Sequence, residues 1–127
     1  EQIINYSKIA KTKKKIFNKY KKQLQKNKFI SLPLENKNKD RDYYLFPIGV
    51  HKKYRNKLIE HLLKKKIFVT VNFRSITELN YYKKKYKRFS CPNSEIWGKE
   101  TISLPFHSKL SEKEIKIICL ELKKFFS

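Results

Sequence analysis

The segment around which the rest of the chain is organised contains three runs, Val71-Asn72-Phe73-Arg74, then Asn80-Tyr81-Tyr82, and then Thr101-Ile102-Ser103-Leu104-Pro105-Phe106. The residues leading into it, 67–72, are rich in β-branched and aromatic side chains and predict a strand. On a strand, Asn72 and Arg74 point the same way and Phe73 the other way. An amide beside a guanidinium suits an anionic or polyhydroxy ligand. The alternative, which the spacing alone favours, is that two polar residues merely end a strand.

The N-terminal part of the chain predicts one long helix over residues 2–27. Its apolar side chains keep a helical spacing, and most of its lysines fall on the other face. Such a basic amphipathic helix can lie on a membrane or along a phosphate backbone, but packing one stripe on a sheet is the commoner case. The apolar positions are Ile3, Tyr6, Ile9, Ala10, Ile16, Phe17, Tyr20 and Leu24.

Two short strands are expected next, over residues 29–34 and 43–50. The residues between them, 35–41, are charged, lack periodicity and predict a loop. Pro47 suggests that the second strand lies at a sheet edge or carries a bulge, because proline cannot donate to a strand ladder.

The second half of the chain alternates helices with strands. His51 is placed to cap a helix over residues 52–65, and a short helix over 92–97 is expected to end at Gly98. Residues 101–106 predict the last strand.

Ser111, with Glu114 three residues later, forms a capping-box pattern that opens a final helix. The chain as a whole therefore predicts an α+β fold, a small and mainly antiparallel sheet covered by helices. The apolar stripe of the final helix is Ile115, Ile118, Cys119, Leu122, Phe125 and Phe126.

Composition limits the function classes. The 127 residues suit one domain, and 39% hydrophobic side chains provide a core. The net charge of +21 comes from 28 lysines but only 4 arginines, so we assign most of it to an AT-rich genome and to solvated faces. Cys91 and Cys119 do not form a metal pattern and predict reduced thiols in a cytoplasmic protein. Neither His51 nor His61 has metal ligands at the spacing of a site, and no apolar run is long enough to span a membrane.

Six pieces of the second half, in this order and spacing, resemble the C-terminal part of the DegT/StrS-type nucleotide-sugar aminotransferases. None of the six is specific by itself. They are Tyr43 to Ile48, Arg55 to Leu62, Val71 to Arg74 with Tyr81-Tyr82, Pro92-Asn93-Ser94-Glu95, Ile102 to His107, and Leu110 to Ile115.

The resemblance implies an enzyme that uses pyridoxal phosphate (PLP) to move an amino group, typically from glutamate, to a keto carbon of a nucleotide-linked sugar. In that family the Schiff-base lysine and the PLP-binding groups lie in a preceding large domain. We therefore expect a C-terminal fragment, with a linking helix over residues 1–28, an α+β small domain resembling that of fold-type I PLP aminotransferases over 29–127, and no large domain. PLP then belongs to the complete enzyme, expected to be a homodimer, and is not bound covalently by this chain.

The same resemblance implies that Asn72, Phe73 and Arg74 bind the substrate, with Thr77 and Tyr82 as support. The chain departs from the family where that pattern has a proline and a histidine, because Ser75 and Thr77 stand there instead.

A third departure is Lys66, which ends a helix where the family usually has glycine, so a lysine must adopt a conformation that glycine adopts more cheaply.

Two other hypotheses remain open at this point. Tyrosines interleave with basic residues over 81–88, which suits a small basic nucleic-acid-binding protein, because aromatic rings stack on bases while lysines neutralise phosphates. For the isolated polypeptide itself we expect an interaction fragment without activity of its own, which exposes the face meant for its large domain.

Overall fold

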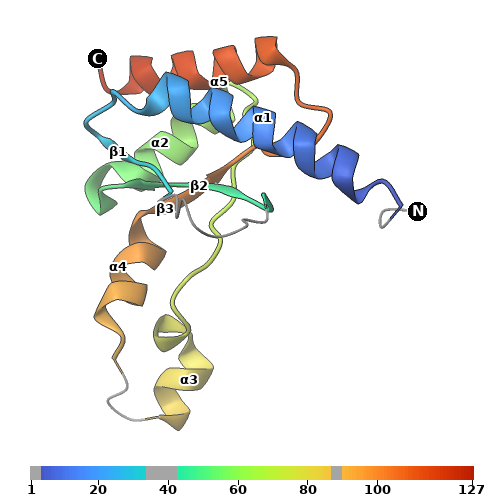
Figure 1. Cartoon of the computed structure of the whole chain (residues 1–127). Helices are drawn as coiled ribbons and strands as arrows, with labels where there is room; N and C mark the ends of the chain where they lie inside the picture. Colours follow the sequence, from blue (N-terminus) through green and yellow to red (C-terminus); the bar gives the residue numbers. More distant parts are fainter. Residues whose placement is uncertain (1–3, 34–42, 87–89) are drawn as a thin grey trace.

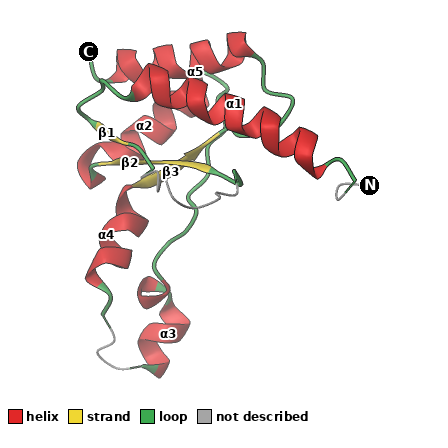
Figure 2. Cartoon of the chain, viewed as in Figure 1, coloured by secondary structure: helices red, strands yellow, loops and turns green. Residues whose placement is uncertain are grey.

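The structure, a computed structural model, describes residues 4–33, 43–86 and 90–127 (Figure 1). Within these ranges the helices and strands follow the predicted order, except that no strand forms over residues 67–72 (Figure 2). The elements are α1 Tyr6–Leu24, β1 Ile30–Ser31, β2 Phe46–Val50, α2 Lys52–Lys64, the 3-10 helix η1 Ile76–Glu78, α3 Asn80–Lys85, α4 Pro92–Glu100, β3 Thr101–Leu104 and α5 Glu112–Phe125.

The three strands form one antiparallel sheet in the order β1-β2-β3. Helices α1, α2 and α5 lie over one side of this sheet, whereas α3 and α4 extend away from its other side (Figure 1). The predicted α+β fold with a small antiparallel sheet covered by helices is confirmed.

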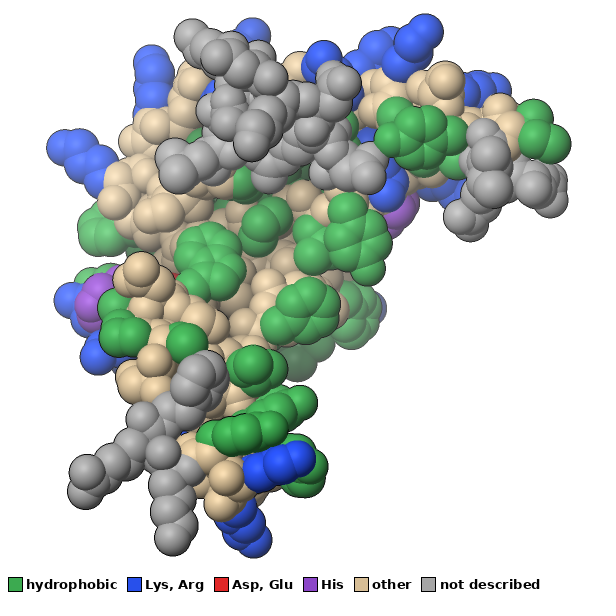
Figure 3. Space-filling view, turned by 60° about the horizontal axis from the view of Figure 1, so that its bottom comes forward, with side chains coloured by type: hydrophobic (Ala, Val, Ile, Leu, Met, Phe, Trp, Pro, Cys, Tyr) green, Lys and Arg blue, Asp and Glu red, His purple; other side chains and the backbone are tan. Residues whose placement is uncertain are grey.

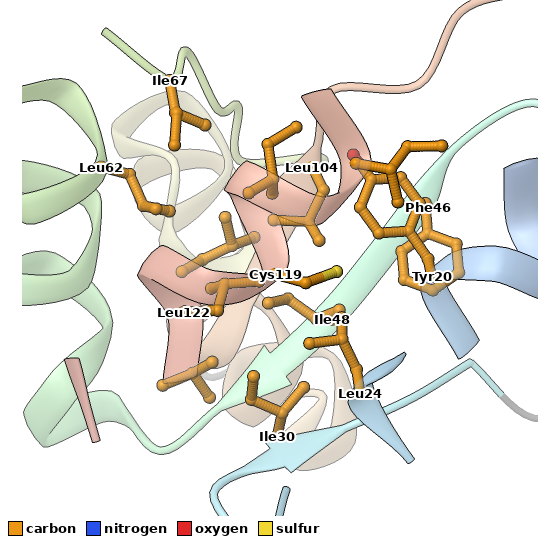
Figure 4. Close-up of a cluster of buried hydrophobic side chains, with 14 of the residues drawn as sticks. Tyr20, Leu24, Ile30, Phe46, Ile48, Leu62, Ile67, Leu104, Cys119 and Leu122 are labelled. Atoms are coloured by element: carbon orange, nitrogen blue, oxygen red, sulfur yellow. The ribbon is translucent and has the colours of Figure 1, made fainter. Parts of the chain in front are cut away.

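The core fills the space between the sheet and the three covering helices (Figure 4). Phe46 of β2 stacks on Tyr20 at 4.8 Å between ring centroids and meets Phe17 edge-on at 5.0 Å. The Tyr20 hydroxyl donates to the Pro105 carbonyl at 3.0 Å, so its one polar atom is satisfied on burial. Each such fully buried aromatic or aliphatic side chain contributes about 1.5–3 kcal/mol.

Helix α1 joins this core through its C-terminal half only. Ile16, Phe17, Tyr20 and Leu24 are buried as predicted, but Tyr6, which belongs to the same predicted stripe, is 56% exposed. The helix is longer than the sheet that it covers, and its N-terminal end projects past the sheet (Figure 1). The helical spacing therefore identified the apolar face of α1 but could not show how far the sheet extends beneath it. Ile3, the first residue of the predicted stripe, lies outside the described residues.

The predicted strand over residues 67–72 is wrong. Only Thr70 pairs, in an isolated antiparallel bridge to Ser103, with nitrogen-to-oxygen distances of 3.2 and 2.7 Å. Ile67 is buried but Phe68 is 72% exposed, so the segment crosses the β3 edge instead of following it. A high content of β-branched residues indicates a fit to a half-buried surface, but strand pairing here extends over one residue only.

The prediction that Pro47 marks an edge strand or a bulge is also wrong, because β2 is the middle strand and pairs with β3 in a continuous register. Its pairing with β1 is confined to Gly49 and Val50, so β1 does not require an N–H from Pro47. Gly49 is closely surrounded: a β-carbon there would lie 3.2 Å from the Ser31 β-carbon and 3.2 Å from Trp97. The predicted loop over 35–41 lies outside the described residues.

Three helix ends follow the sequence signals. His51 caps α2, accepting a hydrogen bond from the Lys53 amide at 3.3 Å, and Ser111 with Glu114 forms the predicted capping box of α5. Lys66 follows α2 with a φ of 59°, which confirms that a lysine adopts the conformation that glycine prefers.

Two hydrogen bonds, from Lys66 N–H to the Leu63 carbonyl at 2.8 Å and from Ile67 N–H to the Leu62 carbonyl at 2.9 Å, complete a Schellman ending of α2.

Candidate functional site

The loop formed by residues 71–79, which includes η1, connects the sheet to α3 beyond the uncovered side of the sheet (Figure 1). Phe73 is 69% exposed and Arg74 is also exposed, whereas Asn72 is half-buried and accepts a hydrogen bond from the Thr70 hydroxyl. The structure records no ion pair or hydrogen bond between the Arg74 guanidinium and any described residue. The three residues expected to bind substrate therefore lie together on one loop, outside any strand.

The following residues of this loop turn inward. Thr77 is buried, and its hydroxyl donates to Oε1 of Glu95 on α4 at 2.8 Å. Ser75 is buried beside it, with 2.8 Å between the Ser75 and Thr77 hydroxyl oxygens, and the Ser94 hydroxyl donates to Ser75 at 3.1 Å. Thr77, expected to support the substrate side, therefore supports the loop from within.

Glu95 is the charged group of this cluster. Its Oε1 also accepts the backbone N–H of Cys91 at 3.1 Å. The hydrogen bond from Thr77, followed by that from Cys91, holds the pKa of the Glu95 carboxyl below its usual value. The carboxylate is therefore ionised at neutral pH and binds both donors strongly.

Tyr82 lies on α3 among other aromatic side chains. Its ring stacks on Tyr86 at 6.3 Å between centroids and meets Tyr81 edge-on at 5.2 Å. The Lys85 ammonium lies 5.5 Å from the Tyr81 ring centroid and 5.6 Å from that of Tyr86. These tyrosines and Lys85 thus contact one another. Of the other basic residues of this patch, Lys83 and Lys84 are exposed on α3, and 87–88 lie outside the described residues.

The lower end of the molecule exposes many apolar side chains. Figure 3 turns this end toward the viewer, with hydrophobic side chains over the middle of the face and most Lys and Arg side chains at its margins. Such a face is typical of an interaction surface or a ligand groove. The 71–79 loop and α4 contribute Phe73, Ile76, Leu79, Ile96 and Trp97, all exposed.

The described residues do not fit the aldehyde of PLP. A Schiff-base lysine is activated by burial, which lowers its pKa, but every lysine in the described ranges is at least partly exposed. The same ranges contain no group of three His, Cys, Asp or Glu side chains placed to hold a metal ion. His61 instead lies 3.2 Å from a Glu121 carboxylate oxygen.

Burial raises the pKa of the Cys119 thiol to about 12, so this cysteine is part of the core and not a nucleophile. None of the helices in the described ranges has the length and apolar character needed to cross a bilayer.

Two residues on α4 were missed as part of the site. In the sequence, Glu95 was noted only as the last residue of Pro92-Asn93-Ser94-Glu95. Its partner Thr77 lies 18 residues earlier, so the contact could not be read from local spacing. The prediction that Gly98 ends the helix is wrong, because α4 continues to Glu100. Gly98 is instead buried against the loop: a β-carbon there would lie 2.8 Å from the Ser75 backbone nitrogen. A glycine inside a helical pattern can indicate close packing, but it can equally indicate the end of the helix, so the sequence did not decide between the two.

Comparison with known proteins gives a consistent result. The model of the DegT/DnrJ/EryC1/StrS aminotransferase family matches residues 1–123. A curated relative, the UDP-4-amino-4,6-dideoxy-N-acetyl-beta-L-altrosamine transaminase of Campylobacter jejuni serotype O:2, is 27% identical over 109 residues, which cover 84% of this chain and 29% of the relative.

Solved aminotransferase structures share the fold. TlmJ from Streptoalloteichus hindustanus has a TM-score of 0.91 at 17% identity, over 98% of this chain and 34% of its own. The putative sugar aminotransferase Spr1654 from Streptococcus pneumoniae, solved in PLP and PMP forms, has a TM-score of 0.87 at 23% identity, over 98% of this chain and 33% of the PLP form. The chain thus spans about a third of the length of the proteins it matches.

Proposed function

Because the chain belongs to the DegT/DnrJ/EryC1/StrS aminotransferase family, we propose that it supplies the sugar side of the active site in an enzyme that aminates a nucleotide-linked keto sugar. In this proposal the 71–79 loop contacts the nucleotide sugar through Asn72, Phe73 and Arg74. The complete enzyme, a homodimer, uses PLP as its cofactor and an amino acid as donor. PLP supplies the electron sink for transamination, and in this proposal the Schiff-base lysine that holds it lies elsewhere in the complete enzyme.

The observation that carries the proposal is the exposure of Phe73 and Arg74 on a loop whose next residues are buried and hydrogen-bonded. A guanidinium presents a planar fork of donors that matches two oxygens of a diphosphate. Because no described acidic group pairs with Arg74, an anionic ligand does not have to displace a carboxylate of this chain from the guanidinium.

Asn72 and Phe73 complete the contact. The Asn72 side-chain oxygen accepts from Thr70, which orients the amide and directs its NH₂ donors elsewhere, suited to sugar hydroxyl oxygens. The exposed Phe73 ring offers an apolar surface on which a sugar or base face can pack. Each of these interactions binds and orients substrate; proton transfer and covalent chemistry belong to groups elsewhere in the complete enzyme.

The proposal is tested by titrating the 127-residue chain with UDP-N-acetylglucosamine in a calorimeter. A lost charged hydrogen-bond pair is worth about 1.5–3 kcal/mol, so Arg74→Ala is expected to weaken binding about tenfold or more. Arg74→Lys keeps the charge without the fork and should retain only part of the affinity. Lys84→Ala on exposed α3 removes an equal charge and serves as the control.

Equal weakening by Lys84→Ala and Arg74→Ala would mean that the ligand senses only the net charge, and the role of Arg74 would be abandoned. A nucleic acid that binds more tightly than the nucleotide sugar, with affinity lost on Tyr82→Ala, would instead favour the basic aromatic patch of α3.

A further inference from the structure

The backbone of the 71–79 loop lies so close to α4 that position 98 of the helix has no room for a β-carbon. A β-carbon on Gly98 would lie 2.8 Å from the Ser75 nitrogen and 3.4 Å from two backbone atoms of Arg74. Because a β-carbon practically never comes within 3 Å of a backbone nitrogen, any other residue at position 98 must displace the loop. The contact falls on the backbone of Arg74 itself, the residue proposed to bind the diphosphate.

Three side-chain contacts act on the same segment. Glu95 accepts from Thr77, as described above. Lys99, four residues after Glu95 on α4, provides the second contact, because its ammonium lies 2.9 Å from a Glu78 carboxylate oxygen. Ile96, the residue after Glu95, faces solvent instead.

Ser94 provides the third contact, donating to Ser75. Ser94, Glu95, Gly98 and Lys99 are spaced so that they share one face of α4, since residues three and four apart are neighbours on a helix. Residues 74–78 of the loop thus contact two neighbouring turns of one helix.

Helix α4 is itself fixed to the rest of the domain. It runs directly into β3, and its last turn is bound by α2, where the Arg55 Nε–H donates to the Lys99 carbonyl at 2.9 Å. A loop bound to this helix therefore takes its position from the sheet and from α2. A loop that left α4 would be held by its neighbours in the chain, the bridged Thr70 on one side and α3 on the other.

From these contacts we infer that Glu95, Thr77 and Gly98 are positioning residues for the nucleotide-sugar site: they hold the 71–79 loop against α4 and so set where Arg74 meets the substrate. The inference rests on the proposed function for the substrate contact, but the clamp between loop and helix stands on geometry alone. The Thr77 hydroxyl holds the loop by its hydrogen bond to Glu95, and the absence of a side chain at Gly98 lets the loop lie against the helix. The residue types threonine and glycine do not by themselves predict these roles.

The clamp is tested by amide hydrogen exchange in the 127-residue chain. The amides of Glu78 and Leu79 are bonded to the Ser75 and Ile76 carbonyls at 3.0 and 3.1 Å and report opening of the loop. Thr77→Val keeps the shape but removes the hydroxyl, and should speed both amides about tenfold or more. Thr77→Ser restores the hydroxyl and should return exchange to the parent rate.

Gly98→Ala is expected to speed the same two amides, because its new β-carbon must push Ser75 away. The Ile115 amide in α5, bonded to the Ser111 carbonyl at 3.1 Å, is the internal control and should keep its parent rate. Unchanged exchange in Thr77→Val and Gly98→Ala would overturn the clamp. Faster exchange at Ile115 as well would also overturn it, since that result means global destabilisation.

Titration of the same variants with UDP-N-acetylglucosamine separates the two proposals. If Arg74→Ala weakens binding and the two clamp variants do so as well, with rescue by Thr77→Ser, the positioning role is supported. If Arg74→Ala weakens binding but the clamp variants do not, positioning is overturned and the substrate contact stands. If Arg74→Ala has no effect, the proposed function fails, and faster exchange at Glu78 still supports the clamp.

Discussion

Replacing Lys66 by glycine should stabilise the protein. A φ of 59° brings the β-carbon of any L-residue close to the following carbonyl, at a cost of about 1–2 kcal/mol. Glycine avoids this cost but loses about 0.5–1 kcal/mol more backbone entropy on folding. The difference leaves a gain of about 1 kcal/mol in the free energy of unfolding, which for a chain of this size raises the melting temperature by about 3–5 °C.

Urea unfolding followed by circular dichroism measures this gain, as a rise of about 0.5 M in the midpoint. Lys66→Ala removes the same side chain but keeps the β-carbon, so it should stay near the parent. Lys65→Gly changes a neighbour whose φ of −89° suits any residue, so it should lose about 0.5–1 kcal/mol. The reasoning is refuted if Lys66→Gly is no more stable than Lys66→Ala.

Three further predictions concern α5 and the thiols. Ser111→Ala removes the cap and should cost about 1 kcal/mol in thermal unfolding, whereas Ser127→Ala, at the exposed end, should cost well under half of that. The hydrogen bonds from Ser111 lower the pKa of Glu114, so its contribution is present at neutral pH and is lost as pH falls through the folded-state pKa. The stability difference between the parent and Glu114→Gln should therefore shrink below about pH 4, and a constant difference would contradict this. A thiol reagent should modify half-buried Cys91 quickly and Cys119 only on unfolding; equal rates would show that Cys119 is not in the core.

Local chemistry made much of the fold predictable. The capping box at Ser111, the cap at His51 and the glycine-like conformation at Lys66 each depend on residues within a few positions, and all three are confirmed. The core stripe of α5 is confirmed for the same reason, since helical periodicity decides which side chains share a face.

Features that depend on distant partners could not be predicted. Residues 67–72 have strand composition, but β3 offers them a single bridge at Thr70. Likewise the inward turn of Thr77 depends on a carboxylate 18 residues later, and the sequence pattern carries no information on that contact. The loop expected to bind substrate was identified from a resemblance, whereas the side chains that hold it against α4 became apparent only in three dimensions.

Glycine usage across this chain separates two kinds of constraint. The sequence contains 28 lysines and two glycines, Gly49 and Gly98, and at both a β-carbon would lie within 3.2 Å of a neighbouring atom. Lys66 occupies a position where only the backbone angle opposes a side chain, at about 1 kcal/mol. In this chain a lysine therefore stands where the penalty is torsional, whereas both glycines stand where a β-carbon would meet a neighbouring atom. The two glycines thus mark two close approaches, of Gly49 to the Ser31 and Trp97 side chains and of Gly98 to the loop backbone.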